Sequence, residues 1–150
     1  MKFILGLREN DPECPIALEA IDLSSNFISS LRQHDLHQTA SSLKKLNIGS
    51  NRLTYLSDDA FTGMTSLQVL NLANNQLAAL PPTVFNKSGQ LQELNLQNNS
   101  LTLVTPELFS GLANLVLLNL SDNAIASHLL TPDTFGGLTS LRILDLSHNR

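Results

Sequence analysis

The sequence has little cysteine, few aromatic residues and few charges. Its 150 residues include one cysteine, one tyrosine and no tryptophan, and charged residues make up only 15%. Nine Lys and Arg stand against thirteen Asp and Glu, which gives a net charge of −4. No basic run therefore predicts binding to nucleic acid or to an anionic membrane surface. The apolar runs are only a few residues long, whereas a membrane-spanning helix needs about 20, so none is expected within this chain.

Cys14 is the single cysteine, and it has no second cysteine in the chain with which to form a disulfide. Two interpretations stay open: a disulfide partner outside these residues in a secreted parent protein, or a free thiol in a loop. The apolar run that begins at Phe3 is interrupted by Arg8 and Glu9. It is shorter than the about 7 to 15 residues of a signal peptide's hydrophobic region, so we expect no signal peptide here.

No catalytic or metal-binding pattern can be recognised. His34 and His37 form an isolated H-x-x-H pair, which without a third ligand is a weak indication of zinc. Glycine-rich phosphate loops and nucleophile motifs are missing. The pair Asp58-Asp59 fits a surface turn better than acid–base catalysis. We therefore expect no enzymatic activity, no cofactor and no metal.

What the sequence does have is a repeat. The pattern L-x-x-L-x-L-x-x-N-x-L occurs in register with intervals of 25, 24, 24, 24 and 26 residues between its first positions. Alternating apolar residues at the fourth and sixth positions predict a short strand with one buried face. Strands of successive repeats would stack in parallel about 4.8 Å apart. The repeats start at Leu18, Leu43, Leu67, Leu91, Leu115 and Leu141.

An asparagine stands at the ninth position of every repeat. Its side-chain amide carries both donors and an acceptor, so a column of amides can satisfy backbone groups that a sharp turn leaves unpaired. Aspartate would lack the N–H donor, and the longer side chain of glutamine would place its amide at a different distance from the backbone. We expect an internal ladder formed by Asn26, Asn51, Asn75, Asn99, Asn123 and Asn149.

The return segment of each repeat is also periodic. A phenylalanine six residues before the next repeat is predicted to stack as a buried spine, formed by Phe61, Phe85, Phe109 and Phe135. Prolines in this segment favour irregular or short helical turns over long helices. Two departures stand out. Ser88 occupies the place of Met64, Leu112 and Leu138 in other repeats, and the fifth repeat carries two extra residues around His128.

These patterns predict an α/β fold, and specifically a leucine-rich-repeat solenoid. It would be a curved right-handed coil with a parallel β-sheet on the concave face and short irregular or helical convex segments. Residues 18–150 form the repeats, the last one truncated, and residues 1–17 are interpreted as the end of a preceding repeat plus an inserted loop. Solenoids need terminal caps and none is recognisable, so we expect an internal part of a longer array.

The register also predicts which side chains point outward from the strands. The third-position column becomes apolar toward the C-terminal end, and neighbouring exposed apolar residues mark contact surfaces. Glu93, Leu117 and Ile143 are therefore the candidate concave contact patch.

Asn86, Asn98 and Asn119 begin N-x-S sequons and are candidate glycosylation sites. With 15 Asn and 26 Ser plus Thr, random order would give about 2.6 sequons, so their number alone does not indicate secretion. Asn86 is the best acceptor because it lies in the convex loop after a spine phenylalanine. Asn119 would point from the concave strand, where a glycan would obstruct binding.

Three segments carry a family resemblance. They are L-Q-E-L-N-L-Q-N-N-S at residues 91–100, P-E-L-F at 106–109, and the expanded fifth repeat through D-T-F-G-G-L at 133–138. The inserted loop with Cys14 before Ile21 adds to them. On these residues the chain resembles the ectodomains of Toll and Toll-like receptors, most of all the long-ectodomain Toll receptors of arthropods.

This resemblance implies the extracellular part of a single-pass membrane receptor of innate immunity or development, a glycoprotein that binds proteins and takes part in signal transduction. Its partner would be a protein ligand such as a cystine-knot cytokine, or another receptor copy, and no nucleic acid is expected. The family's ligand contacts form no fixed motif, so none can be carried over. Two alternatives stay open: a secreted or membrane-anchored adhesion or matrix protein, and an intracellular adaptor or enzyme inhibitor.

Overall fold

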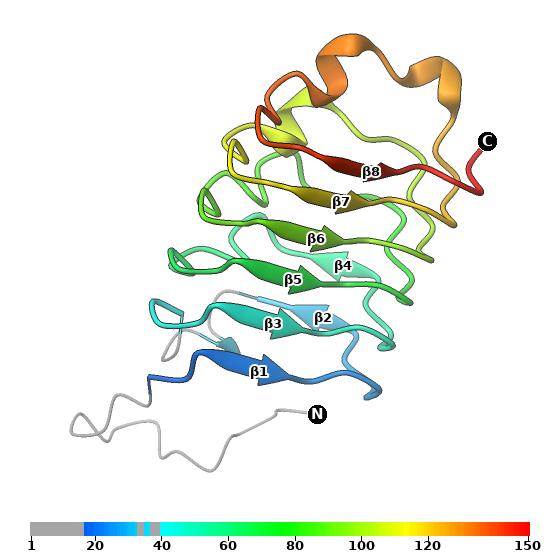
Figure 1. The fold of residues 1–150 in the computed structure, drawn as a ribbon. Helices are drawn as coiled ribbons and strands as arrows, with labels where there is room; N and C mark the ends of the chain where they lie inside the picture. The colour runs from blue at the N-terminus through cyan, green and yellow to red at the C-terminus, as the bar shows by residue number, and fades with distance from the viewer. Residues whose placement is uncertain (1–16, 33–34, 37–39) are drawn as a thin grey trace.

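The structure is a computed structural model that describes residues 17–32, 35–36 and 40–150. Each repeat contributes one short strand to a parallel sheet, and the strands follow one another in chain order (Figure 1). The predicted leucine-rich-repeat solenoid with its parallel sheet is confirmed. The strands of this sheet are β1 (Ala20–Asp22), β3 (Lys45–Asn47), β5 (Val69–Asn71), β6 (Glu93–Asn95), β7 (Leu117–Asn119) and β8 (Ile143–Asp145).

Strands pair at the same position of the repeat throughout this sheet. Leu46 in β3 lies opposite Ile21 on one side and Leu70 on the other. The middle residue of each strand from β1 to β7 is buried, because it faces the interior of the coil. Leu144 in β8 is 39% exposed, because β8 is the last strand in the sheet. Identical register places equivalent side chains in straight columns across the coil.

The outer side of the coil contains short turns and a second, smaller sheet. In it, β2 (Ser30–Leu31) pairs in parallel with β4 (Tyr55–Leu56), which the sequence did not predict. The predicted helical segments are 3-10 turns in the described residues, and none is an α-helix. They are η2 (Pro106–Phe109), η3 (Ser127–Leu129) and η4 (Pro132–Phe135). Proline lacks an N–H and suits the first turn, so η2 and η4 both begin with one.

The spine phenylalanines lie in the core as two stacked pairs. Phe61 stacks on Phe85 and Phe109 stacks on Phe135, each pair with ring centroids 5.7 Å apart. The first three rings are at most 1% exposed, and Phe135 is half-buried beside the last turn. Together with the inward leucines they form one continuous hydrophobic cluster that joins every repeat to its neighbours.

One position that is apolar in the other repeats holds a serine in this core. The N–H of Ser88 donates to the carbonyl oxygen of Phe85, and the Ser88 carbonyl accepts from Leu91, each at 2.9 Å. Met64 and Leu112 make the equivalent bonds in their own repeats, so Ser88 occupies the same place. It is 1% exposed, and within the described residues its hydroxyl has no hydrogen-bond partner. An unpaired buried hydroxyl destabilises the fold.

Candidate functional site

Each strand is followed by a sharp turn with one left-handed residue. At the eighth position of the repeat φ lies between 50° and 57°, in Ser25, Ser50, Asn74, Asn98, Asp122 and His148. Short polar side chains are the non-glycine residues that tolerate this conformation best, so most members of the column are Ser, Asn or Asp. The repeated kink directs the next residue, the ladder asparagine, toward the interior.

The ladder asparagines bond to their own turn and to the preceding coil. The Nδ2 of Asn75 donates to the carbonyl oxygens of Leu72 at 3.0 Å and Ile48 at 3.1 Å, and its Oδ1 accepts the Leu53 N–H at 2.9 Å. Ile48 and Leu53 belong to the preceding repeat. Asn26, in the first repeat, donates to Leu23 and Ser24 of its own turn. The same bonds to the preceding coil are made by Asn51, Asn99, Asn123 and Asn149.

A second polar column lies on the exposed face of the sheet. At the fifth position, Oδ1 accepts the backbone N–H two residues later at 2.8–3.0 Å, in Asp22, Asn47, Asn71, Asn95, Asn119 and Asp145. The repeat pattern did not predict this turn-closing role, although the residue types of the column are consistent with it. Asp and Asn share only an acceptor oxygen, and both occur in this column, whereas the ladder, which must donate, contains Asn alone.

The predicted contact residues lie side by side on the exposed face. Glu93 is paired in register with Leu117, and Leu117 with Ile143. Val69 in β5 lies opposite Glu93 on the other side and extends the row. Ile143 is 54% exposed, Glu93 is exposed, and Leu117 and Val69 are half-buried. We call these four residues the third-column patch.

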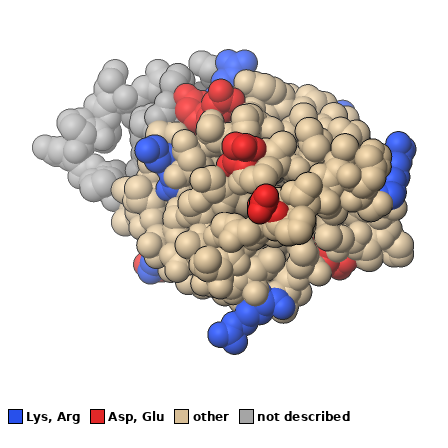
Figure 2. Space-filling model, turned by 90° about the horizontal axis from the view of Figure 1, so that it is seen from above, with Lys and Arg blue, Asp and Glu red and all other residues tan. Residues whose placement is uncertain are grey.

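Charge is sparse around the third-column patch. Figure 2, in which the molecule is seen from above, shows scattered Asp, Glu, Lys and Arg side chains on an end of the coil made mostly of uncharged residues. Lys45 and Glu93 are the charged members of the third-position column. Lys44, beside the sheet, forms an ion pair with Glu19 at 2.7 Å. The third-position column, all of it within the described residues, contains one Lys and no Arg, so it lacks the basic stripe on which phosphate backbones bind.

Polar side chains connect the last three strand turns. Asp122 accepts a hydrogen bond from Gln97 Nε2 at 3.0 Å and lies 2.9 Å from His148 Nδ1. The hydrogen bond from Gln97 is the main cause that lowers the pKa of Asp122, and His148 lowers it further. Hydrogen bonds from Ser147 lower the pKa of Asp145 in the same way. Folding therefore stabilises the charged form of both carboxylates relative to the unfolded chain.

The lowered pKa values predict how stability depends on pH. For a carboxylate with a lowered folded-state pKa, the stabilisation is fully present above the unfolded value, here 3.8, and is lost as pH falls through the folded value. We expect the urea midpoint to be constant from pH 7 to 5 and to decrease below pH 4. Asp122→Asn, which keeps the acceptor oxygen, should reduce this decrease. An equal reduction in Glu93→Gln, the matched exposed carboxylate, would contradict the assignment to Asp122.

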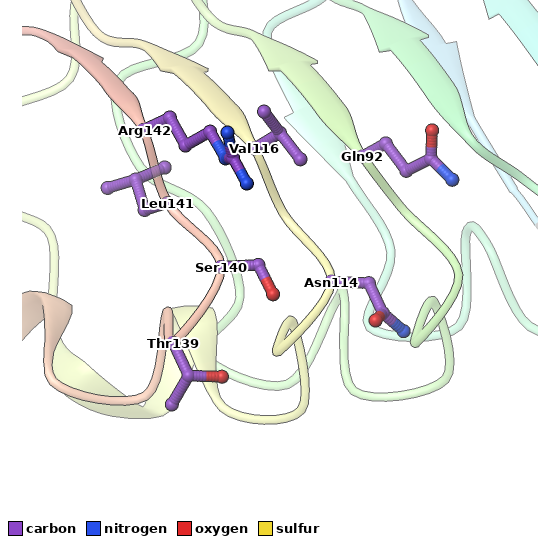
Figure 3. A pocket seen from close by; sticks show the side chains of 7 residues that line it. All are labelled: Gln92, Asn114, Val116, Thr139, Ser140, Leu141 and Arg142. Carbon is purple, nitrogen blue, oxygen red and sulfur yellow. The ribbon is translucent and has the colours of Figure 1, made fainter.

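A shallow open depression of about 620 Å³ lies where β6, β7 and β8 begin (Figure 3). Two polar groups at its wall link adjacent turns: Asn114 Nδ2 donates to the Gly89 carbonyl at 2.7 Å and Thr139 Oγ1 to the Ala113 carbonyl at 3.4 Å. The lining contains no carboxylate or histidine, so it offers no general base. Its residues are Gln92, Asn114, Val116, Thr139, Ser140, Leu141 and Arg142.

The three sequon asparagines lie in different surroundings. Asn86 is exposed in the outer turn that leads to β6. Asn98 is exposed at a left-handed turn, and its Nδ2 donates to Asn74 Oδ1 at 2.8 Å. Asn119 is half-buried in β7, and its Oδ1 accepts both the N–H and the hydroxyl of Ser121, at 2.9 and 2.8 Å.

The leucine rich repeat family matches residues 41–101, 67–125 and 89–150, which together extend from 41 to the C-terminal residue. The chain belongs to the leucine-rich repeat family. A comparison with curated protein sequences gives no significant match.

Solved leucine-rich repeat structures are similar over most of this chain. One such protein of Leptospira interrogans is 32% identical with a TM-score of 0.77, over 89% of this chain and 32% of that one. TLR13, in complex with ssRNA13, is 27% identical with a TM-score of 0.74, over 87% and 21%. A chain of the octameric complex of latrophilin 3, Unc5D and the FLRT2 repeats is 26% identical with a TM-score of 0.80, over 89% and 40%. This leucine-rich repeat chain spans between 21% and 40% of these proteins.

Some expected features of this leucine-rich repeat chain fall outside the described residues. Cys14, His34 and His37 are among them, so neither the thiol nor the H-x-x-H pair is placed. In residues 17–32, 35–36 and 40–150, no three or more His, Cys, Asp or Glu are grouped to hold a metal ion. The same ranges contain no helix with the length and apolarity to cross a membrane.

Proposed function

We propose that this chain is a ligand-binding part of the extracellular region of a Toll-type transmembrane signalling receptor, and that it binds a protein through the exposed face of its sheet. The observation that carries the proposal is the third-column patch. Leu117 and Ile143 lie next to each other in register, beside the carboxylate of Glu93. Contiguous exposed apolar residues with a polar border are typical of protein interfaces.

The scaffold holds this patch rigidly. Each of β6, β7 and β8 is paired in register, and ladder amides of the next coil bind the turns that follow β6 and β7. Adjacent third-column side chains are therefore kept about 4.8 Å apart. A surface that is ordered before binding loses little conformational entropy when a partner docks, which favours affinity.

The chemistry of the patch favours a protein over a nucleic acid. TLR13 is solved with a single-stranded RNA, so the fold is compatible with such a ligand. Here the net charge is −4, and Glu93 lies in the patch between Val69 and Leu117. A phosphate backbone would be repelled, whereas a protein ligand that presents apolar and basic side chains would fit.

An adhesion or matrix role is the second candidate. The similarity to a chain from the complex of FLRT2 with Unc5D and latrophilin 3, at a TM-score of 0.80, favours it. The two candidates differ outside these residues. A parent transcript encoding a membrane span followed by a cytoplasmic TIR domain would support the receptor, and a secreted or otherwise anchored parent without a TIR domain would support adhesion.

Surface plasmon resonance can test the binding face. The immobilised chain would be probed with a cystine-knot cytokine, with a second copy of the chain and with single-stranded RNA. We expect binding to one of the protein probes, and the double variant Leu117→Ala with Ile143→Ala should weaken it about tenfold or more, as loss of central apolar contacts does. The matched control is Leu103→Ala with Leu129→Ala, which removes two leucines that are 49% and 45% exposed outside the sheet.

Two outcomes of this experiment would contradict the proposal. One is equal weakening by the patch variant and the control variant, which would place the contact elsewhere. The other is binding of RNA but of neither protein probe, which would assign a different class of ligand. Unchanged binding in the control variant with a loss in the patch variant would support it.

A further inference from the structure

We propose that Asn86 is N-glycosylated, and that Ser88 stands in the hydrophobic core because it completes the Asn86-Lys87-Ser88 sequon. This inference rests on the extracellular location proposed above. It adds a modification site and assigns a chemical reason to a core residue that packing does not explain.

The sequence of this turn departs from its equivalents at two places. After the spine phenylalanine, the other repeats read F-T-G-M at 61–64, F-S-G-L at 109–112 and F-G-G-L at 135–138. Residues 85–88 read F-N-K-S instead. Gly63 and Gly111 adopt φ values of 88° and 87° in their turns, and Lys87 replaces the glycine here. Ser88 replaces the leucine or methionine, and this second departure creates the N-x-S motif.

Ser88 has no packing role that a serine fulfils better than a leucine. It is 1% exposed, and its hydroxyl has no hydrogen-bond partner in the described residues. Met64 and Leu112, at the same place in the neighbouring repeats, are equally buried and fill the core with apolar atoms. A hydroxyl here therefore costs stability, because both its hydration and the apolar contacts are lost.

The sequon gives the hydroxyl a role before folding. Glycan transfer to an unfolded chain requires the third residue of the motif to be Ser or Thr, and its later burial does not matter. The Asn86 Nδ2 forms a bond to the anomeric carbon of an oligosaccharide carried on a lipid pyrophosphate. The bond from that carbon to the pyrophosphate oxygen breaks, the lipid pyrophosphate leaves, and one amide proton is released. After folding, Asn86 remains exposed and the glycan extends into solvent.

The other two sequons show no such conflict between sequence and fold. Asn98 already uses its Nδ2 to donate to Asn74, and its serine, Ser100, is exposed. In the third sequon, the Ser121 hydroxyl donates to Asn119, so it has a structural partner. Asn119 also lies in register between Asn95 and Asp145 on adjacent strands, where a glycan would be crowded.

A glycan at Asn86 is compatible with binding at the sheet. Asn86 lies outside the strands, in the turn that leads from the outer side to the edge where β6 begins. The turns that enter the strands line one edge of the sheet, at the left in Figure 1. A glycan there shields an outer surface from partners and leaves the third-column patch open.

The test compares glycan occupancy and melting temperature. The whole chain would be secreted from a eukaryotic cell line behind a cleavable leader, and enzymatic deglycosylation in heavy-oxygen water followed by peptide mapping would identify occupied asparagines. We expect a glycan on Asn86 in the wild type and in Ser88→Thr, and none there in Asn86→Gln, Ser88→Ala or Ser88→Leu. In bacterially produced chains without glycans, Ser88→Ala should melt above the wild type and Ser88→Leu higher still.

An unmodified Asn86 in the secreted wild type would overturn the inference. So would a Ser88→Ala chain that melts no higher than the wild type, because Ser88 would then have a structural role. Ser88→Ala needs no additional space, so it is decisive even where the larger leucine does not fit. Partner binding is measured on unglycosylated chains. A missing glycan with intact binding therefore counts against this inference alone, and a glycan without partner binding counts against the proposed function alone.

Discussion

Replacing Asn75 with aspartate should leave the chain largely unfolded at room temperature, a loss of about 4 to 5 kcal/mol or more. The amide of Asn75 is buried and donates to three carbonyl oxygens, of Ile48, Leu72 and Ala73. A carboxylate would place negative charge against these oxygens without a proton to donate. Asn75→Ala, which leaves the Leu53 N–H unpaired, should cost about 2 to 4 kcal/mol.

Urea unfolding followed by circular dichroism would measure both variants. Asn86→Asp is the matched control, since it makes the same chemical change at an exposed asparagine, and it should shift the free energy of unfolding by less than about 0.5 kcal/mol. If Asn75→Asp unfolded at the urea concentration of this control, the ladder would contribute nothing to stability.

The second large effect is expected in the spine. Phe85→Ala should lower the free energy of unfolding by about 3 to 5 kcal/mol, because the ring is fully buried and its removal leaves a cavity. Phe85 also stacks on Phe61, so the contact between two coils is lost together with the buried area. Because Phe85 lies mid-array, the urea transition should also broaden if the two halves uncouple.

The matched control for Phe85 is Phe27. Phe27 is 70% exposed, and its ring contacts the guanidinium of Arg52 at 4.5 Å. Phe27→Ala should therefore cost no more than about 1 kcal/mol, the value of an exposed cation–π contact. Equal losses in Phe27→Ala and Phe85→Ala would contradict a stabilising spine.

The features that recur in every repeat were predictable from the sequence, because one explanation had to fit six equivalent positions. The inward leucines and the parallel register follow from the repeat in this way. Contacts that occur once were not predictable. The β2–β4 pair joins only the first two repeats, and the contact between Phe27 and Arg52 depends on the particular residues at the tenth position of each.

The candidate site shows the same difference between features that follow from the repeat and features that do not. Register alone placed Glu93, Leu117 and Ile143 beside one another, but it could not give their exposure. Ile143 is 54% exposed, whereas Leu117 is half-buried and therefore less exposed. The reason is that β7 has a neighbouring strand on both sides and β8 on one side. The fifth-position column was recognised as outward-facing but not as turn-closing, since that role depends on a bond within two residues and not on periodicity.

The asparagine ladder gives the array a direction. Each turn is completed by the coil that follows it: the Leu101 N–H is bound by Asn123 and the Ile125 N–H by Asn149. Coils taken away from the N-terminal side leave the first remaining asparagine without its partners in the coil before it: Asn75, for example, would lose the Ile48 carbonyl and the Leu53 N–H. Coils taken away from the C-terminal side leave backbone groups of the turn that becomes terminal, such as the Leu101 N–H, without the amide that binds them. Shortening the array therefore breaks one layer of bonds at either end, but it leaves a side-chain amide unpaired at the front and main-chain groups unpaired at the back.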